Sequence, residues 1–199
     1  MLIETVKIQN GIIHNLHLHN ERIKKSRREI LGINSQEDIS FLPEILTIPV
    51  TERIIKARIL YDKRILKVEW EYYKPRIIKS LKIVEDNEIE YSYKFSDRST
   101  LDKLYAKRGE CDEIIIVKNG FLTDSTFSNL VFHDGRRWVT PSTPLLPGTK
   151  RNQLIKEGKI EVEELMVSDL KRFNKCSLIN ALNDLGEIIA VWSMDDIKD

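Results

Sequence analysis

The sequence predicts an α+β fold divided into two domains. Strand-like runs of alternating or continuous apolar residues are interleaved with a few segments that have the spacing of an amphipathic helix. Residues 85–88 are acidic and have no hydrophobic period, which is typical of a linker. A chain of 199 residues suits one compact domain or two small ones. We therefore expect a small α+β domain over residues 1–84, a linker over 85–93 and a larger, sheet-rich domain over 94–199.

The first half of the chain begins with a strand that leads into a tight turn. Residues 3–8 tend to alternate between apolar and polar side chains, and Asn10-Gly11 follows, a pair that tolerates the positive φ of tight turns. A helix is expected from Asn20 to Leu31, because its apolar residues have helical spacing and a glycine stops it. Further elements expected in this half are a helix that starts at Ser35, strands over 53–61 and 65–73 joined as a hairpin at Asp62-Lys63-Arg64, and a strand over 76–84.

The second half is organised around Asn119-Gly120, another pair that favours a tight turn. The short apolar run within residues 112–117 precedes this turn and residues 130–132 follow it, so both segments are expected to be strands. The segment between them, 123–129, is densely polar. The other expected elements are helices over 100–108, 150–157 (capped by Thr149) and 167–172, and strands over 159–165, 176–182 and 188–191.

Composition excludes several classes of protein. Hydrophobic residues make up 41% of the chain, and 32 basic against 31 acidic residues give a net charge of +1, so neither nucleic acid nor a membrane surface is an expected partner. Cys111 and Cys176 lack metal-ligand spacing and are interpreted as buried residues of a reducing, cytoplasmic protein without a signal peptide. His14, His17 and His19 have no cysteine or carboxylate at ligand spacing, so no metal site is expected.

The polar segment 123–129 has two interpretations. One is an ordinary polar loop; the other is a carboxylate held at the edge of a sheet to meet a ligand. Its order, Thr-Asp-x-x-x-x-Asn before an apolar strand, resembles the Thr-Glu-x-x-x-x-Asn hallmark of the class IV aminotransferase family. These fold type IV pyridoxal-phosphate enzymes include branched-chain and D-amino-acid transaminases and 4-amino-4-deoxychorismate lyase. Asp124 stands where the family usually has Glu, so the carboxylate is kept but is one methylene shorter.

Other motifs extend the resemblance from about residue 2 to 191. Residues 19–26 resemble the family's His-x-x-Arg-Leu-x-x-Ser, 94–98 its Lys-x-x-Asn/Asp-Arg, and 148–151 its Gly-Ile-x-Arg, with Thr149 in place of Ile. Asn180-Ala181-Leu182 resembles the lyase branch more than the branched-chain transaminases. The resemblance implies the two-domain, D-amino-acid aminotransferase-like architecture. Family members usually carry further strands before the segment that matches residues 3–5, so the N-terminal domain is expected to be shortened.

The resemblance also implies a set of site residues. Lys94 would carry pyridoxal 5'-phosphate as a Schiff base and act as general base and acid, and Asp124 would pair with the pyridine nitrogen. Taken alone, Lys94 is one lysine among many. The phosphate of the cofactor would be bound by four residues: Arg22, Gly148, Thr149 and Lys150. The other cofactor residues would be Ser128, Asn129, Asn183 and Asp184. Arg98 and Arg151 would bind the substrate. A homodimer is implied as well.

Three functions stay open. We favour a lyase that converts 4-amino-4-deoxychorismate into 4-aminobenzoate and pyruvate in folate biosynthesis, because of the Asn180-Ala181-Leu182 match and the small size of the chain. The first alternative is a class IV aminotransferase of D- or branched-chain amino acids. The second is a cofactor-free binding protein on the same fold.

Overall fold

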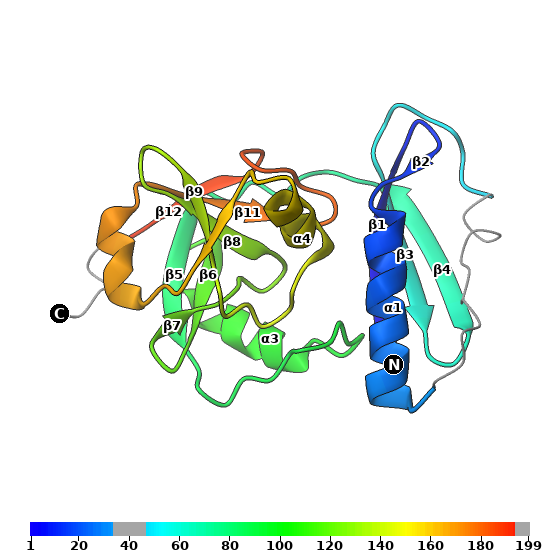
Figure 1. The fold of residues 1–199 in the computed structure, drawn as a ribbon, viewed down its shortest axis with the longest axis horizontal. Coiled ribbons are helices and arrows are strands. Elements are labelled where there is room, and N and C mark those ends of the chain that lie inside the picture. Colours follow the sequence, from blue (N-terminus) through cyan, green and yellow to red (C-terminus); the bar gives the residue numbers. More distant parts are fainter. Residues whose placement is uncertain (34–46, 194–199) are drawn as a thin grey trace. The chain divides into compact units, whose positions relative to one another are not determined.

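The computed structural model describes residues 1–33 and 47–193. Contacts divide the chain into two compact units, which are drawn in Figure 1 and are described separately. The N-terminal unit comprises Met1–Lys74 and Tyr93–Asp97, and the C-terminal unit comprises Pro75–Ser92 and Arg98–Asp199. The expected helix start at Ser35 lies outside the described residues.

The N-terminal unit is an antiparallel sheet with a helix along one face (Figure 1). The strand order is β2-β1-β3-β4. Its elements are β1 (Leu2–Gln9), β2 (Ile12–Ile13), α1 (Leu16–Leu31), β3 (Ile55–Tyr61) and β4 (Ile65–Tyr72). The core between sheet and helix contains alternate residues of both central strands, together with helix residues such as Ile23. The hairpin of β3 and β4 confirms the prediction from the β-rich runs.

Local signals set the turns of this unit. Asn10 and Gly11 have φ values of 53° and 73°, as a two-residue hairpin loop requires. Gly32 ends α1 with φ 65°, a conformation that glycine adopts without strain. The helix begins four residues earlier than predicted, at Leu16, because Leu16 and Leu18 add to its buried face.

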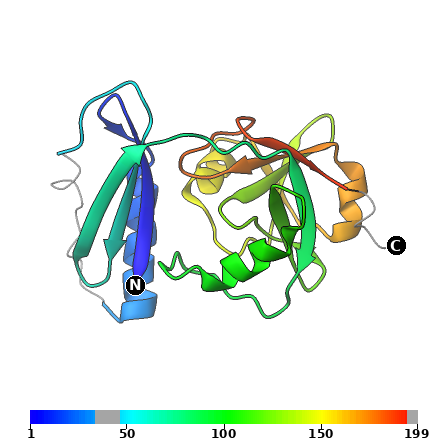
Figure 2. The same cartoon turned by 180° about the vertical axis from the view of Figure 1, so that it is seen from behind.

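The C-terminal unit is a single sheet that curls until its edges meet (Figures 1 and 2). The strand order is β10-β9-β8-β11-β12-β5-β6-β7. The edges are joined beyond β10, where the Leu122 amide donates to the Leu165 carbonyl and the Val167 amide to the Gly120 carbonyl. The strands are β5 (Ser80–Glu85), β6 (Glu113–Lys118), β7 (Phe121–Leu122), β8 (Asn129–His133), β9 (Trp138–Pro141), β10 (Glu161–Glu163), β11 (Lys175–Ile179) and β12 (Ile189–Trp192). The helical elements are α3 (Ser99–Tyr105), the short 3₁₀ turns Ala106–Arg108 and Val167–Arg172, and α4 (Thr149–Lys156).

The core of this unit follows the two-residue period of its strands. Leu130 and Phe132 on β8 belong to the main cluster, whereas Val131 between them packs with Leu154 of α4. Asn119 and Gly120 have φ values of 53° and 81°, which confirms the predicted tight turn between β6 and β7. Among the described residues, no helix is both long and apolar enough to cross a membrane.

Some elements differ from the expectation. β5 pairs in parallel with β6 and β12, so residues 75–92 lie with the C-terminal unit rather than with the first domain and its linker. The reason is that Leu81 of β5 is fully buried in the core of the curled sheet. The segment 85–88, which was expected to be a linker, is instead a turn in which the Asp86 amide donates a hydrogen bond to the Val117 carbonyl. Thr149 is the first residue of α4, not its cap, and Cys111 is only half-buried, whereas Cys176 is buried.

Candidate functional site

The polar segment between β7 and β8 is a tightly bonded loop. Thr123 donates to the Ile116 carbonyl through its amide (3.0 Å) and its hydroxyl (2.7 Å), and the Ile116 amide donates to the Asp124 carbonyl (2.8 Å). At the other end, the Ser125 amide donates to the Ser128 carbonyl at 2.9 Å, and the hydroxyls of the two serines lie 2.8 Å apart. The loop is therefore more than a solvated connection, because it holds Asp124 in a fixed place beside β6.

Asp124 is a buried carboxyl group with both oxygens engaged. Only 6% of the residue is exposed. Oδ1 accepts a hydrogen bond from Asn129 Nδ2 (2.7 Å), and Oδ2 accepts one from the Leu146 amide (2.9 Å). Burial raises the pKa of Asp124 to about 6, although these hydrogen bonds and the charge of Arg151 act in the opposite direction. A carboxyl group of this kind is well suited to pair with a protonated ring nitrogen.

Asn129 connects Asp124 to the start of α4. Its Nδ2 also donates to the Leu146 carbonyl (2.9 Å), and its Oδ1 accepts from the Gly148 amide (3.2 Å). A Cβ on Gly148 would stand 2.2 Å from Asn129 Oδ1, so only glycine fits there. Gly148 is the N-cap of α4, and no side chain caps the helix. Because the first amides of a helix have no partner inside it, they suit an anion such as a phosphate.

Other predicted residues of the C-terminal unit lie around the same end of the sheet. Lys150 Nζ donates to Asp184, and Asn183 is fully buried. Arg151 is buried and donates to Thr140 Oγ1 (3.3 Å) and to the Pro141 carbonyl (2.8 Å). Burial lowers the pKa of Arg151, against the opposing charge of Asp124. The guanidinium of Arg151 thus lies inside the unit, and its expected role in substrate binding stays a prediction.

Lys94 belongs to the N-terminal unit. Its carbonyl accepts a hydrogen bond from the Ile3 amide (2.9 Å), and the Ser96 amide donates to the Met1 carbonyl (3.1 Å). These bonds hold the segment Tyr93–Asp97 along the start of β1. The segment that carries Lys94 is therefore fixed against the strand from which Glu4 projects.

Glu4, His19 and Arg22 form a buried cluster near Lys94. Glu4 is fully buried, and its two oxygens accept from Arg22 Nε (2.7 Å) and Nη2 (2.6 Å). His19 Nδ1 lies 2.7 Å from Glu4 Oε2. Burial acts to raise the pKa of Glu4, but the Arg22 charge and the hydrogen bonds from Arg22 and His19 prevail and lower it to about 2. Burial lowers the pKa of His19, with smaller contributions from the charges of Arg22 and Lys94.

This cluster changes the interpretation of two residues. The side chain of Arg22 is only 14% exposed, so it is not one more solvated charge on a basic helix. Glu4 was not among the expected site residues, although its even position on β1 places it in the core-facing row of Leu2, Val6 and Ile8. A carboxylate in such a row is the signal that could have revealed it. Among the described residues, no group of three metal-ligating side chains is placed to hold an ion.

Comparisons with known proteins agree on one family. A family model described as amino-transferase class IV matches residues 71–191. An uncharacterized protein of Haemophilus influenzae is 40% identical over 185 residues, which cover 92% of this chain and 98% of that protein. The crystal structure of a Haemophilus somnus protein provisionally named 4-amino-4-deoxychorismate lyase has a TM-score of 0.85 at 33% identity, covering 92% of this chain and 97% of that one. A Mesorhizobium loti protein provisionally named amino-acid aminotransferase has a TM-score of 0.79 at 22% identity, covering 96% and 99%.

Proposed function

The chain belongs to the class IV aminotransferase family and has the fold of the fold type IV enzymes; from this premise we propose that it is a pyridoxal-phosphate-dependent enzyme that acts on an amine. Aminotransferases of the same fold from Mycobacterium tuberculosis and Brucella abortus were solved with pyridoxal phosphate bound. Both are 14% identical to this chain, so they support the fold alone. The cofactor assignment therefore depends on the residues of this chain.

Asp124 is the observation that carries the proposal. A phosphorylated pyridine needs a carboxylate for its ring nitrogen and donors for its phosphate, and the C-terminal unit has both in one connected group. Asp124 accepts a hydrogen bond from Asn129, and Asn129 in turn accepts one from the Gly148 amide at the start of α4. An ionised Asp124 holds a proton on the ring nitrogen, since a nearby negative charge raises the pKa of that nitrogen. When bound, the cofactor supplies the electron sink for carbanion chemistry.

The family resemblance assigns the other roles to residues of the N-terminal unit. We propose that Lys94 is the attachment point of the cofactor and the group that moves the proton at the carbon bearing the amine. Arg22 would bind the phosphate. Glu4 accepts from Nε and Nη2 of Arg22, and these two hydrogen bonds fix the direction of the guanidinium group. Glu4 is thus a positioning residue for Arg22.

For the substrate, we propose 4-amino-4-deoxychorismate, with 4-aminobenzoate and pyruvate as products. The likeness to the Haemophilus somnus protein and the match at Asn180-Ala181-Leu182 favour this reaction. The Mesorhizobium loti protein favours the alternative, a class IV aminotransferase. A cofactor-free binding protein is the second alternative. We also propose a homodimer, as the family resemblance implies.

A coupled assay separates these functions. Aminodeoxychorismate is generated enzymatically, 4-aminobenzoate is followed by fluorescence, and pyruvate by lactate dehydrogenase. In parallel, a panel of D- and L-amino acids is tested for conversion of the bound cofactor to its pyridoxamine form. Both products, with no fast conversion, support the lyase. Conversion by an amino acid without 4-aminobenzoate identifies a transaminase and refutes the lyase.

Mass spectrometry tests the attachment point. After borohydride reduction, the pyridoxyl group is expected on Lys94, and Lys94→Ala should abolish both the label and turnover. Lys118→Ala is a matched control, because Lys118 is a lysine of the C-terminal unit engaged with Ile89 and Glu90. A label on another lysine would refute the assignment of Lys94. A protein that takes up no cofactor would favour the binding-protein alternative.

A further inference from the structure

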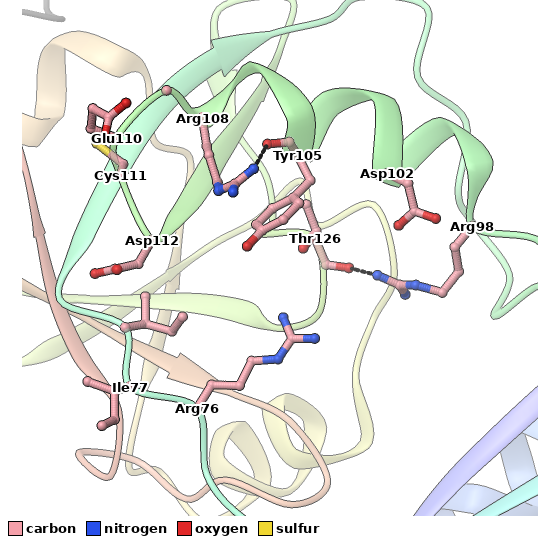
Figure 3. Close-up of a pocket in the computed structure, with 12 residues that line it drawn as sticks. Arg76, Ile77, Arg98, Asp102, Tyr105, Arg108, Glu110, Cys111, Asp112 and Thr126 are labelled. Atoms are coloured by element: carbon pink, nitrogen blue, oxygen red, sulfur yellow. Dashed lines mark hydrogen bonds between the residues drawn. The ribbon is translucent and has the colours of Figure 1, made fainter.

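The C-terminal unit contains a pocket of about 680 Å³ that none of the proposed cofactor residues lines. Its walls come from α3 and the turn that follows it, from the segment before β5 and from the residues just before β6, and Thr126 closes one side (Figure 3). Three of its lining residues are arginines: Arg76, Arg98 and Arg108. The pocket lies wholly within one unit, so its walls are set by that unit alone.

The arginines are held by aromatic rings and carbonyl groups rather than by carboxylates. Arg108 Cζ lies 4.1 Å from the centre of the Tyr105 ring, and its Nη1 donates to the Tyr105 carbonyl at 3.3 Å. Arg76 Cζ lies 4.7 Å from the centre of the Phe127 ring. Arg98 Nη2 donates to the Thr126 carbonyl at 2.7 Å. In the part of the chain that the structure describes, none of the three arginines is close enough to a carboxylate for an ion pair, although burial raises the pKa of Glu113 and the charge of Arg76 acts to lower it.

Of the three acidic residues of the lining, Asp102 lies beside Arg98, whereas Glu110 and Asp112 lie farther from Arg76 and Arg108 (Figure 3). Asp112 Oδ2 already accepts three hydrogen bonds, from the Lys79 amide (2.8 Å) and from the amide and hydroxyl of Ser80 (3.1 Å each). Figure 3 shows Arg76, Arg108 and the Tyr105 side chain pointing toward one another, with Asp112 and Glu110 directed away from that point. The guanidinium groups of Arg76 and Arg108 therefore converge on one part of the pocket, although the lining contains as many acids as arginines.

Two isoleucines give the pocket an apolar side. Ile77 and Ile78 line it: Ile77 is 80% exposed, which is unusual for a large aliphatic side chain, whereas Ile78 is 8% exposed and belongs to the core of the unit. Guanidinium groups bind carboxylate and phosphate oxygens through paired N–H donors. A ligand with an anionic group and an apolar body matches both features.

We propose that this pocket binds a small organic anion, with its carboxylate or phosphate between Arg76 and Arg108 and its apolar body on the side of the pocket lined by Ile78. The site is separate from the residues proposed for the cofactor, although Arg98, which the family resemblance assigns to substrate binding, lines it. It contacts the loop that carries Asp124, because Thr126 lines the pocket. Thr126 is fixed in turn by Glu113, which accepts from its hydroxyl at 2.9 Å. A ligand in the pocket would therefore contact Thr126 and could change the position of the loop that carries Asp124.

Titration calorimetry with two matched probes tests the site. Benzene-1,3-dicarboxylate and phenyl phosphate share an aromatic body and differ in the anionic group, so their relative affinities assign the ligand to the carboxylate or the phosphate class. The protein is first saturated with pyridoxal phosphate, which occupies the proposed phosphate site at Arg22 and α4. Binding of at least one probe is expected, and it should weaken as salt is added.

Variants locate the bound probe. Arg76→Gln and Arg108→Gln should each weaken binding by about tenfold or more, because each removes a charge-assisted contact. Arg136→Gln is the matched control: Arg136 is an exposed arginine of the same unit, in the turn after β8, and affinity should stay unchanged. Thermal unfolding verifies that each variant is folded, as expected for the exposed Arg76.

Three results would overturn the proposal. They are the absence of binding of both probes to the folded protein, binding that survives both pocket substitutions, and binding that is lost with Arg22→Ala instead. The proposal does not depend on the proposed enzyme activity, since the same titrations are repeated on cofactor-free protein. The titrations and the activity assay can therefore give different answers. The protein could be active without binding the probes, or bind the probes without being active.

Discussion

Glu4→Gln should strongly destabilise the protein, because it removes the charge that compensates Arg22 inside the N-terminal unit. Two estimates of the magnitude agree. The fall in the pKa of Glu4 from 4.5 to about 2 corresponds to roughly 3 kcal/mol at about 1.4 kcal/mol per pKa unit. Removal of one partner of a buried ion pair typically costs about 3–5 kcal/mol. We therefore expect Glu4→Gln to lower the free energy of unfolding by roughly 3 kcal/mol.

Urea denaturation followed by circular dichroism measures this loss. Glu71→Gln is a matched control on the same sheet, because Glu71 pairs with Lys56 at the surface and should change stability little. In the wild type, the depressed pKa of Glu4 makes its contribution complete above pH 4.5, and it is lost as the pH falls toward 2. Glu4→Gln should lack that dependence. If Glu4→Gln is as stable as Glu71→Gln, the buried cluster is not a significant source of stability.

Three further predictions concern the proposed cofactor site. In cofactor-free protein the raised pKa of Asp124 favours the protonated, folded state, so stability should fall as the pH rises from 3.8 through about 6, by roughly 3 kcal/mol. Asp124→Asn should remove this pH dependence in thermal unfolding, and an unchanged profile would contradict the burial argument. Gly148→Ala should release the cofactor and lower the unfolding midpoint, because its Cβ would stand 2.2 Å from Asn129 Oδ1 although the backbone φ of −72° suits alanine. Arg22→Ala should lose pyridoxal phosphate on dialysis far more readily than Arg28→Ala on the same helix, by roughly 1.5–3 kcal/mol of affinity, and equal retention would mean that Arg22 does not bind the phosphate.

Local structure was predictable wherever a short segment determines it. The Asn-Gly pairs at 10–11 and 119–120 both form two-residue turns, because the need for positive φ is satisfied by those residues themselves. The hairpin of β3 and β4 was predictable for the same reason, since both strands and their turn lie within about twenty residues of sequence. None of these features requires knowledge of the rest of the chain.

The partners of each strand were harder to predict. The β5 sequence shows only that it is a strand, whereas its neighbours β6 and β12 lie far along the chain. The boundary expected at 85–93 came from composition, and composition does not report which sheet buries Leu81. The pocket arginines are a similar case: Arg76 and Arg108 are brought together only by the pairing of β5 with β6 and the placement of α3.

The candidate site has features that a short segment of sequence predicts and features that depend on distant parts of the chain. A motif match identified Asp124 as a carboxylate of interest, but its raised pKa is a property of burial beneath Asn129 and Leu146. The same contacts bear on the replacement of Glu by Asp. Both oxygens of the shorter side chain reach their donors at normal hydrogen-bond lengths, 2.7 and 2.9 Å, so the loop and the start of α4 already accommodate an aspartate. A longer side chain at this position would have to displace one of those donors. The hydrogen bonds around Asp124 are therefore complete with the shorter side chain.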